Sequence, residues 1–141
     1  FEHLEVYDDY AHHPEEIKTT VRAVKSSFPN DRLITVFQPH TISRTLAFLD
    51  DFADALTISD EVVLVKIYQS ARENGDRAQE LTARLAEKIE EKGKHVKVVE
   101  NLTEGTEWIQ REKASSEGLV LTMGAGDVRG VGEKLLATCK A

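Results

Sequence analysis

Five short apolar segments recur along the 141-residue chain, and the longer segments between them carry apolar residues at helical spacing. Apolar runs of about four to eight residues bounded by polar loops are typical of buried strands. Such runs are rich here in the β-branched residues valine and isoleucine, which favours strands over helices. The predicted strands are Leu4–Tyr7, Leu33–Phe37, Val62–Ile67, Val96–Val99 and Leu119–Thr122.

The segments that follow these strands have the period of amphipathic helices. Alternating strands and helices predict right-handed βαβ units, so we expect one α/β domain over residues 1–141. Its sheet should be mostly parallel, with helices on both faces as a three-layer fold. The helical positions are Ile17, Val21, Val24 and Phe28; Phe48, Phe52, Ala55 and Leu56; Leu81, Leu85 and Ile89; Val128, Val131, Leu135 and Leu136; and, more weakly, Trp108 and Ile109.

Composition changes this picture mainly by excluding partners. The 25 acidic and 18 basic residues give a net charge of -7, which would repel a phosphate backbone, so we do not expect nucleic acid binding. No apolar run approaches the ~18 residues of a membrane span, and no signal-peptide pattern is present. The single Cys139 fits a reducing compartment. We expect a cytoplasmic domain, and the start at Phe1 suggests either a processed product or a piece of a longer protein.

Ligands of parallel α/β sheets bind beyond the carboxyl ends of the strands, so the segments after each strand are the candidates for function. The first is DDYAHHP. Pro14 suits the first turn of a helix, and His13 could cap that helix. Capping does not explain Asp9, Tyr10 and His12. A carboxylate at a strand end is well placed to accept hydrogen bonds from ribose hydroxyls.

A dedicated protein metal site is not expected in this first segment. An aspartate and a histidine together could hold a divalent cation, but neighbouring histidines on a loop point in different directions.

The second segment, FQPHTISRT, places His40 and Arg44 four residues apart around a turn. Arginine offers a planar fork of donors that can grip a carboxylate or a phosphate. The alternative is a surface arginine paired with Asp50 or Asp51.

The third and fourth segments carry weaker signals. YQSARENGD is polar and typical of a surface loop. In TMGAGDV, the backbone around Gly124 and Gly126 could cradle an anion, although a tight turn would also use glycine. No GxxxxGK[ST] phosphate loop occurs in the chain.

In this order and spacing, DDYAHHP, FQPHTISRT and MGAGD resemble the C-terminal domain of the Mur ligases, from about Val6 to about Leu136. The first two motifs resemble the branch that joins L-alanine to UDP-N-acetylmuramate in peptidoglycan precursor synthesis. The resemblance implies a Rossmann-like domain that works beside an N-terminal domain for the UDP-sugar and a central ATPase domain. Alone, such a domain should not turn over ATP.

The resemblance also implies roles for individual residues. Asp9 would bind the ATP ribose, with Tyr10 and His12 beside the nucleotide. His40 and Arg44 would face the reacting carboxylates and the incoming L-alanine. Gly124, Ala125 and Gly126 would line the amino-acid side of the cleft. Mg²⁺ would be held mainly by the central domain.

Two other interpretations stay open at this point. Paired aspartates after a first strand also occur in receiver-type domains, although QPH, YQS and MGAG stand where such a site needs a further aspartate and a lysine. The chain could also be a free-standing nucleotide-binding or interaction module without catalysis.

Overall fold

The computed structural model describes residues 4–9, 13–39, 42–66, 75–113 and 118–124. Strands and helices alternate along these ranges as the sequence predicts. The last predicted helix, around 128–136, lies outside them. The elements are β1 (Leu4–Asp9), α1 (Pro14–Ser27), β2 (Leu33–Phe37), α2 (Ile42–Ala47), α3 (Leu49–Leu56), β3 (Glu61–Val65), α4 (Gly75–Glu91), β4 (His95–Val99), α5 (Leu102–Lys113) and β5 (Gly118–Met123).

All described strand pairs are parallel, and the order across the sheet is β1-β5-β2-β3-β4. The last described strand, β5, therefore lies between β1 and β2. Its register aligns Met123 with Asp9 on one side and with Phe37 on the other. Because the strands are parallel, the ends of β1, β5 and β2 meet side by side at the carboxyl edge of the sheet.

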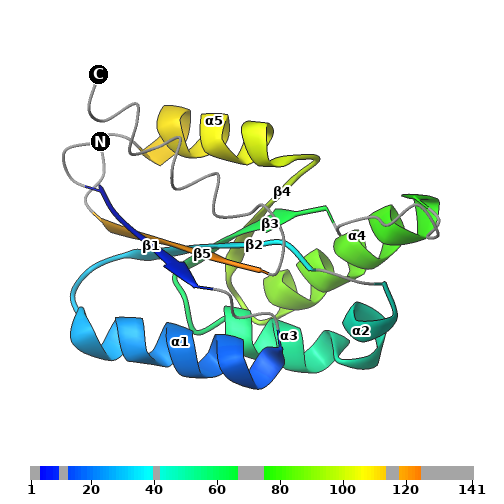
Figure 1. Cartoon of the computed structure of the whole chain (residues 1–141), viewed down its shortest axis with the longest axis horizontal. Helices are drawn as coiled ribbons and strands as arrows, with labels where there is room; N and C mark the ends of the chain where they lie inside the picture. The colour runs from blue at the N-terminus through cyan, green and yellow to red at the C-terminus, as the bar shows by residue number, and fades with distance from the viewer. Residues whose placement is uncertain (1–3, 10–12, 40–41, 67–74, 114–117, 125–141) are drawn as a thin grey trace.

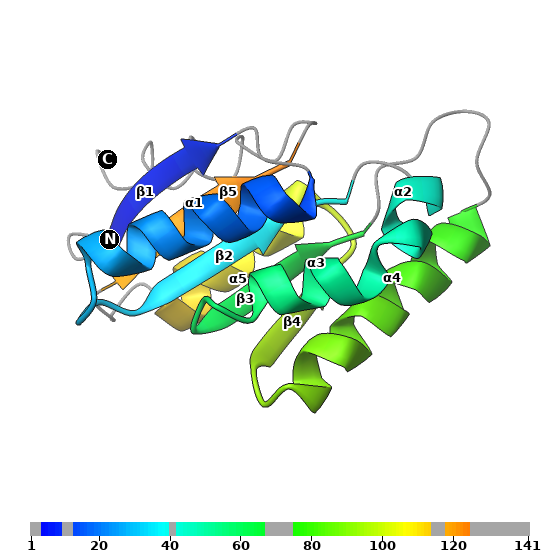
Figure 2. The ribbon, with the colours of Figure 1, turned by 90° about the horizontal axis from the view of Figure 1, so that it is seen from below.

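Helices cover both faces of the sheet, which confirms the predicted three-layer α/β fold (Figure 1). The larger hydrophobic core lies under α1, α3 and α4, with Ile17, Phe37 and Phe52 fully or almost fully buried. A smaller core lies under α5 and includes Trp108 and Ile109. Figure 2 shows α1, α3 and α4 on the near side of the sheet and α5 behind it.

Two details of the middle of the chain differ from the sequence-based expectation. Residues 42–47 form the short helix α2, where a turn is expected, because six residues hold too few turns for a helical repeat to be visible. Phe48, expected on the buried face of the next helix, is instead the N-cap residue of α3 and is 36% exposed.

A charged cluster at the opposite, amino edge of the sheet joins α1, β2 and β3. Asp60 Oδ2 accepts hydrogen bonds from Lys25 Nζ and from the Leu33 N–H, both at 2.8 Å. The Asp60 N–H donates in return to the Leu33 carbonyl at 3.0 Å. Partial burial opposes ionisation of this carboxyl, but the hydrogen bonds from Lys25 and Leu33 outweigh it and hold the pKa of Asp60 below its ordinary value of 3.8.

We expect Asp60→Asn to make the protein less stable at neutral pH, by about 1 kcal/mol or less because the pair is partly exposed. The folded pKa is depressed, so the contribution of Asp60 is fully present above 3.8 and is lost as the pH falls through the lower folded value. Urea unfolding from pH 7 to pH 2 should show the wild-type and variant curves converging at acid pH. Asp31→Asn, at an exposed neighbouring position, controls for the loss of one charge. A constant difference across this range would contradict the assignment.

Candidate functional site

The described candidate residues lie on segments that begin at the carboxyl edge of β1, β5 and β2. Asp9 is the last residue of β1, two residues beyond the predicted end of that strand, and its Cα partner is Met123. Gly124 follows Met123 directly. On the other side of β5, the chain leaves β2 after Phe37 and reaches Arg44 within seven residues. Strand order thus places the described first residues of the first, second and fourth candidate segments next to one another.

Of the first candidate segment, the structure describes Asp9 and His13, whereas Tyr10 and His12 lie outside the described residues. His13 is the N-cap of α1: its Nδ1 accepts from the Glu15 N–H at 3.5 Å, and its own N–H donates to Glu16 Oε1 at 3.2 Å. Pro14 is buried at the first helical position. His13 therefore has the capping role that the sequence left open, and part of the crowding in DDYAHHP is explained by this helix start.

In the second segment, Arg44 is half-buried on α2, and His40 lies outside the described residues. Thr45, the residue after Arg44, is buried and anchors α2 to the body of the domain. Asp50, one of the two acids considered as a partner for Arg44, bonds to Lys88 Nζ at 2.8 Å. That hydrogen bond and the Lys88 charge hold the pKa of Asp50 below its ordinary value.

In the fourth segment, Gly124 is buried and has a φ of 146°, a conformation that residues with a side chain rarely adopt. The glycine at this position is therefore required by the backbone as the chain leaves β5. Ala125 and Gly126 lie outside the described residues.

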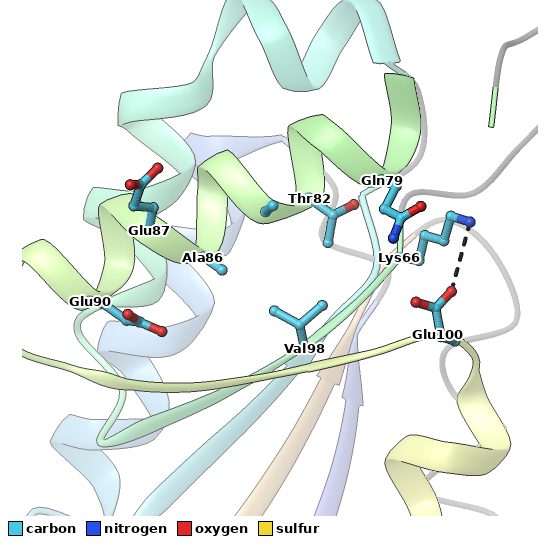
Figure 3. A pocket seen from close by; sticks show the side chains of 9 residues that line it. Lys66, Gln79, Thr82, Ala86, Glu87, Glu90, Val98 and Glu100 are labelled. Atoms are coloured by element: carbon cyan, nitrogen blue, oxygen red, sulfur yellow. Dashed lines mark ion pairs between the residues drawn. The ribbon is translucent and has the colours of Figure 1, made fainter. Parts of the chain in front are cut away.

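A groove of about 510 Å³ opens elsewhere, between α4 and the edge strand β4 (Figure 3). Val98 rises from β4 toward α4 along its floor. Its lining carries Glu87, Glu90 and Glu100 against the single cation Lys66, which pairs with Glu100 at 3.7 Å. An excess of carboxylates disfavours a phosphate or carboxylate ligand. None of the described candidate residues lines this groove, so it is distinct from the strand-end site.

The described part of the chain lacks two further features. It contains no group of three or more His, Cys, Asp or Glu side chains placed to hold a metal ion. It also contains no helix that is long and apolar enough to cross a membrane.

A family model described as "Mur ligase, glutamate ligase domain" matches residues 2–126, a range that contains the first two motifs of the resemblance and the MGAG of the third. The chain belongs to this family. Relatives named UDP-N-acetylmuramate--L-alanine ligase extend the agreement. The protein of that name from Lachnospira eligens is 43% identical over 136 residues, which are 96% of this chain and 29% of that protein. The one from Acetivibrio thermocellus is 45% identical over 134 residues, 94% of this chain and 28% of that protein.

A solved structure agrees with these relatives. This chain superposes on the crystal structure of the UDP-N-acetylmuramate-alanine ligase MurC from Thermotoga maritima with a TM-score of 0.73 and 28% sequence identity. The superposed region covers 97% of this chain and 27% of the Thermotoga maritima chain. The chain thus spans less than a third of the length of the curated relatives described above. The family predicted from the three motifs is confirmed, and a receiver-type domain is not supported.

We expect Gly124→Ala to lower the free energy of unfolding by about 1–3 kcal/mol, because it forces a side chain into the conformation at φ 146°. Gly105→Ala is the matched control. This glycine lies in α5, and an added Cβ would meet Val99 Cγ2 at 3.5 Å and Val63 Cγ1 at 3.8 Å, which are ordinary contacts. Alanine should stabilise this helix by roughly 0.5–1 kcal/mol. Urea unfolding measures both, and two shifts of the same sign would contradict the backbone argument.

Proposed function

We propose that this chain is the C-terminal domain of an ATP-dependent ligase that adds L-alanine to UDP-N-acetylmuramate during peptidoglycan precursor synthesis. The observation that carries the proposal is identity of 43–45%, over nearly the whole chain, to proteins named for that reaction. A free-standing binding module is not favoured, because the relatives of that name are more than three times as long as the matched region. The partners of this domain would be the N-terminal and central domains of its own protein.

The proposed reaction has two steps. The γ-phosphoryl group of ATP is transferred to a carboxylate oxygen of UDP-N-acetylmuramate, giving an acyl phosphate and ADP. The L-alanine amine then attacks the acyl carbon, phosphate leaves, and the nitrogen loses a proton as the amide forms. Catalysis of such phosphoryl transfer depends mainly on positioning and on stabilisation of negative charge.

The residues of this domain would bind and orient the reactants. Asp9 would accept hydrogen bonds from the ATP ribose, and Tyr10 and His12 would lie beside the nucleotide. Support comes from the position of Asp9 at the carboxyl end of β1, where parallel sheets bind nucleotides. Mg²⁺ would be held mainly by the central domain, where it would neutralise charge on the phosphates.

His40 and Arg44 would face the reacting carboxylates and the incoming L-alanine, and Gly124, Ala125 and Gly126 would line the amino-acid side of the cleft. A half-buried guanidinium is suited to this role, because a charge shielded from water interacts more strongly with a bound anion. Closure of this domain over the ATPase domain would exclude water and protect the acyl phosphate from hydrolysis.

The test uses the full-length ligase and measures L-alanine-dependent phosphate release. We expect Arg44→Ala to lower kcat/KM by about 10²–10³-fold, the usual effect of removing one group that stabilises charge in the transition state. Arg44→Lys should recover only part of this loss, because lysine cannot form the two parallel hydrogen bonds of a guanidinium. Asp9→Ala should raise the KM for ATP. Arg22→Ala, an exposed arginine on α1, is the matched control and should leave the rate unchanged.

Three results would contradict parts of this proposal separately. Unchanged activity in Asp9→Ala and Arg44→Ala would refute the residue roles even with the family correct. Phosphate release that depends on a different amino acid would refute the L-alanine assignment. Steady ATP hydrolysis by the 141-residue chain alone would refute its dependence on a separate ATPase domain.

A further inference from the structure

An aromatic contact links the first and second candidate segments. The ring centroids of His13 and Phe48 lie 5.3 Å apart and the ring planes are tilted by 56°, a favourable arrangement for two aromatic rings. His13 comes at the start of α1, after β1, and Phe48 comes between α2 and α3, after β2. The contact therefore joins the segment that contains Asp9 to the segment that contains Arg44.

On its first side, the contact is held by the start of α1. The capping bond from the Glu15 N–H to His13 Nδ1 fixes the direction of the imidazole, and the bond from the His13 N–H to Glu16 fixes its backbone. The His13 carbonyl also accepts the Ile17 N–H at 3.0 Å, and Ile17 is fully buried. The imidazole is thus attached to the main core through the first turn of the helix.

On its second side, the contact is linked to Arg44 by a backbone hydrogen bond of Phe48. The Phe48 N–H donates to the Arg44 carbonyl at 3.1 Å, and the Phe48 carbonyl accepts the Phe52 N–H at 2.9 Å. Phe48 has φ -121° and ψ 28°, which is where the chain turns from α2 into α3. The location of the Phe48 ring therefore fixes the end of α2, one helical turn from Arg44.

Burial shows that this ring does not serve only the hydrophobic core. Phe52, four residues further on, is 1% exposed and contacts Phe37 in the core, whereas Phe48 is 36% exposed. The six-residue α2 is too short to be stable by itself, so its orientation depends on its contacts with the rest of the domain, which include the buried Thr45 and, at its C-terminal end, Phe48. The partly exposed Phe48 ring, placed against the capping histidine His13, supplies one of these contacts.

We propose that His13 and Phe48 are positioning residues that fix Arg44 relative to the nucleotide-binding segment of β1. This inference rests on the proposed function for its effect on catalysis, and on the geometry alone for its effect on α2. Loss of either ring lets α2 shift, so the guanidinium spends less time in the productive orientation. Small misplacements of a positioning group are costly to rate, up to about 10²-fold for 1 Å.

The first experiment is a kinetic one with the full-length ligase. His13→Asn removes the ring and keeps a side chain that caps helices well, and Phe48→Leu removes the ring and keeps apolar bulk. We expect each to lower kcat for L-alanine-dependent phosphate release by about 10-fold, with the KM for ATP nearly unchanged. The double variant should lose no more than either single one, and Phe48→Tyr should restore the rate. Val98→Ala, an exposed apolar residue on β4, is the control.

The decisive comparison uses the Arg44→Ala background. If the two rings act through Arg44, His13→Asn and Phe48→Leu should have no further effect once the guanidinium is gone. Losses that multiply with that of Arg44→Ala would overturn the proposal, because they would show a role independent of Arg44.

The second experiment does not require activity. Hydrogen exchange of the full-length protein, read by mass spectrometry over residues 42–52, should show faster exchange in α2 for His13→Asn, while α5 exchanges as before. Unchanged exchange in α2 would overturn the positioning role. If the wild-type protein releases no phosphate with L-alanine, the proposed function fails, and the exchange experiment still decides whether the two rings hold α2.

Discussion

The parallel direction of all described strands is the constraint on which the candidate site depends. Each strand ends at the same edge of the sheet, so each following segment begins there. The insertion of β5 between β1 and β2 then decides which segments are neighbours. In sequence order the first and last strands are far apart, whereas in the sheet Asp9, Met123 and Phe37 form one row. Segments from three distant parts of the chain thereby begin at one edge of the sheet, and no long loop is needed to bring them there.

Different kinds of stabilisation hold the two edges of the sheet. At the amino edge, the Asp60 carboxylate joins α1, β2 and β3 through Lys25 and Leu33. At the carboxyl edge, the described contacts include a capped helix start at His13, an aromatic pair of His13 and Phe48, and a hydrogen bond from the Gln38 N–H to the Met123 carbonyl. A charged cluster thus stabilises the amino edge, whereas a helix cap and a ring contact join segments at the carboxyl edge, where we propose that ligands bind.

Much of the fold was predictable, because the buried strands are apolar runs whose lengths and neighbours leave little ambiguity. All five strands are confirmed, with β1 extending to Asp9 and β5 to Met123, whereas β3 ends at Val65, short of the predicted end at Ile67. Helix α2 was not predictable, since six residues show no clear repeat, and Phe48 was misassigned because an apolar residue before Phe52 fits the helical spacing by chance. Strand order depends on which face of the sheet each connecting segment crosses. The hydrophobic pattern within a single strand or helix carries no information about this. Of the predicted site residues, Asp9, Arg44 and Gly124 can be placed, and the roles of all of them remain proposals.

The place of β5 in the sheet also has a consequence for how the chain folds. Among the described strands, β1 pairs only with β5, and its register joins Leu4 to Gly118. Pairing between such distant segments closes a long loop before it gains stabilising contacts, which slows folding. Until β5 arrives, β1 lacks this partner and β2 has one open side, so an early folding intermediate would expose strand edges that can pair with other chains. Synthesis and refolding of this domain should therefore be most vulnerable to aggregation before its last strand is in place.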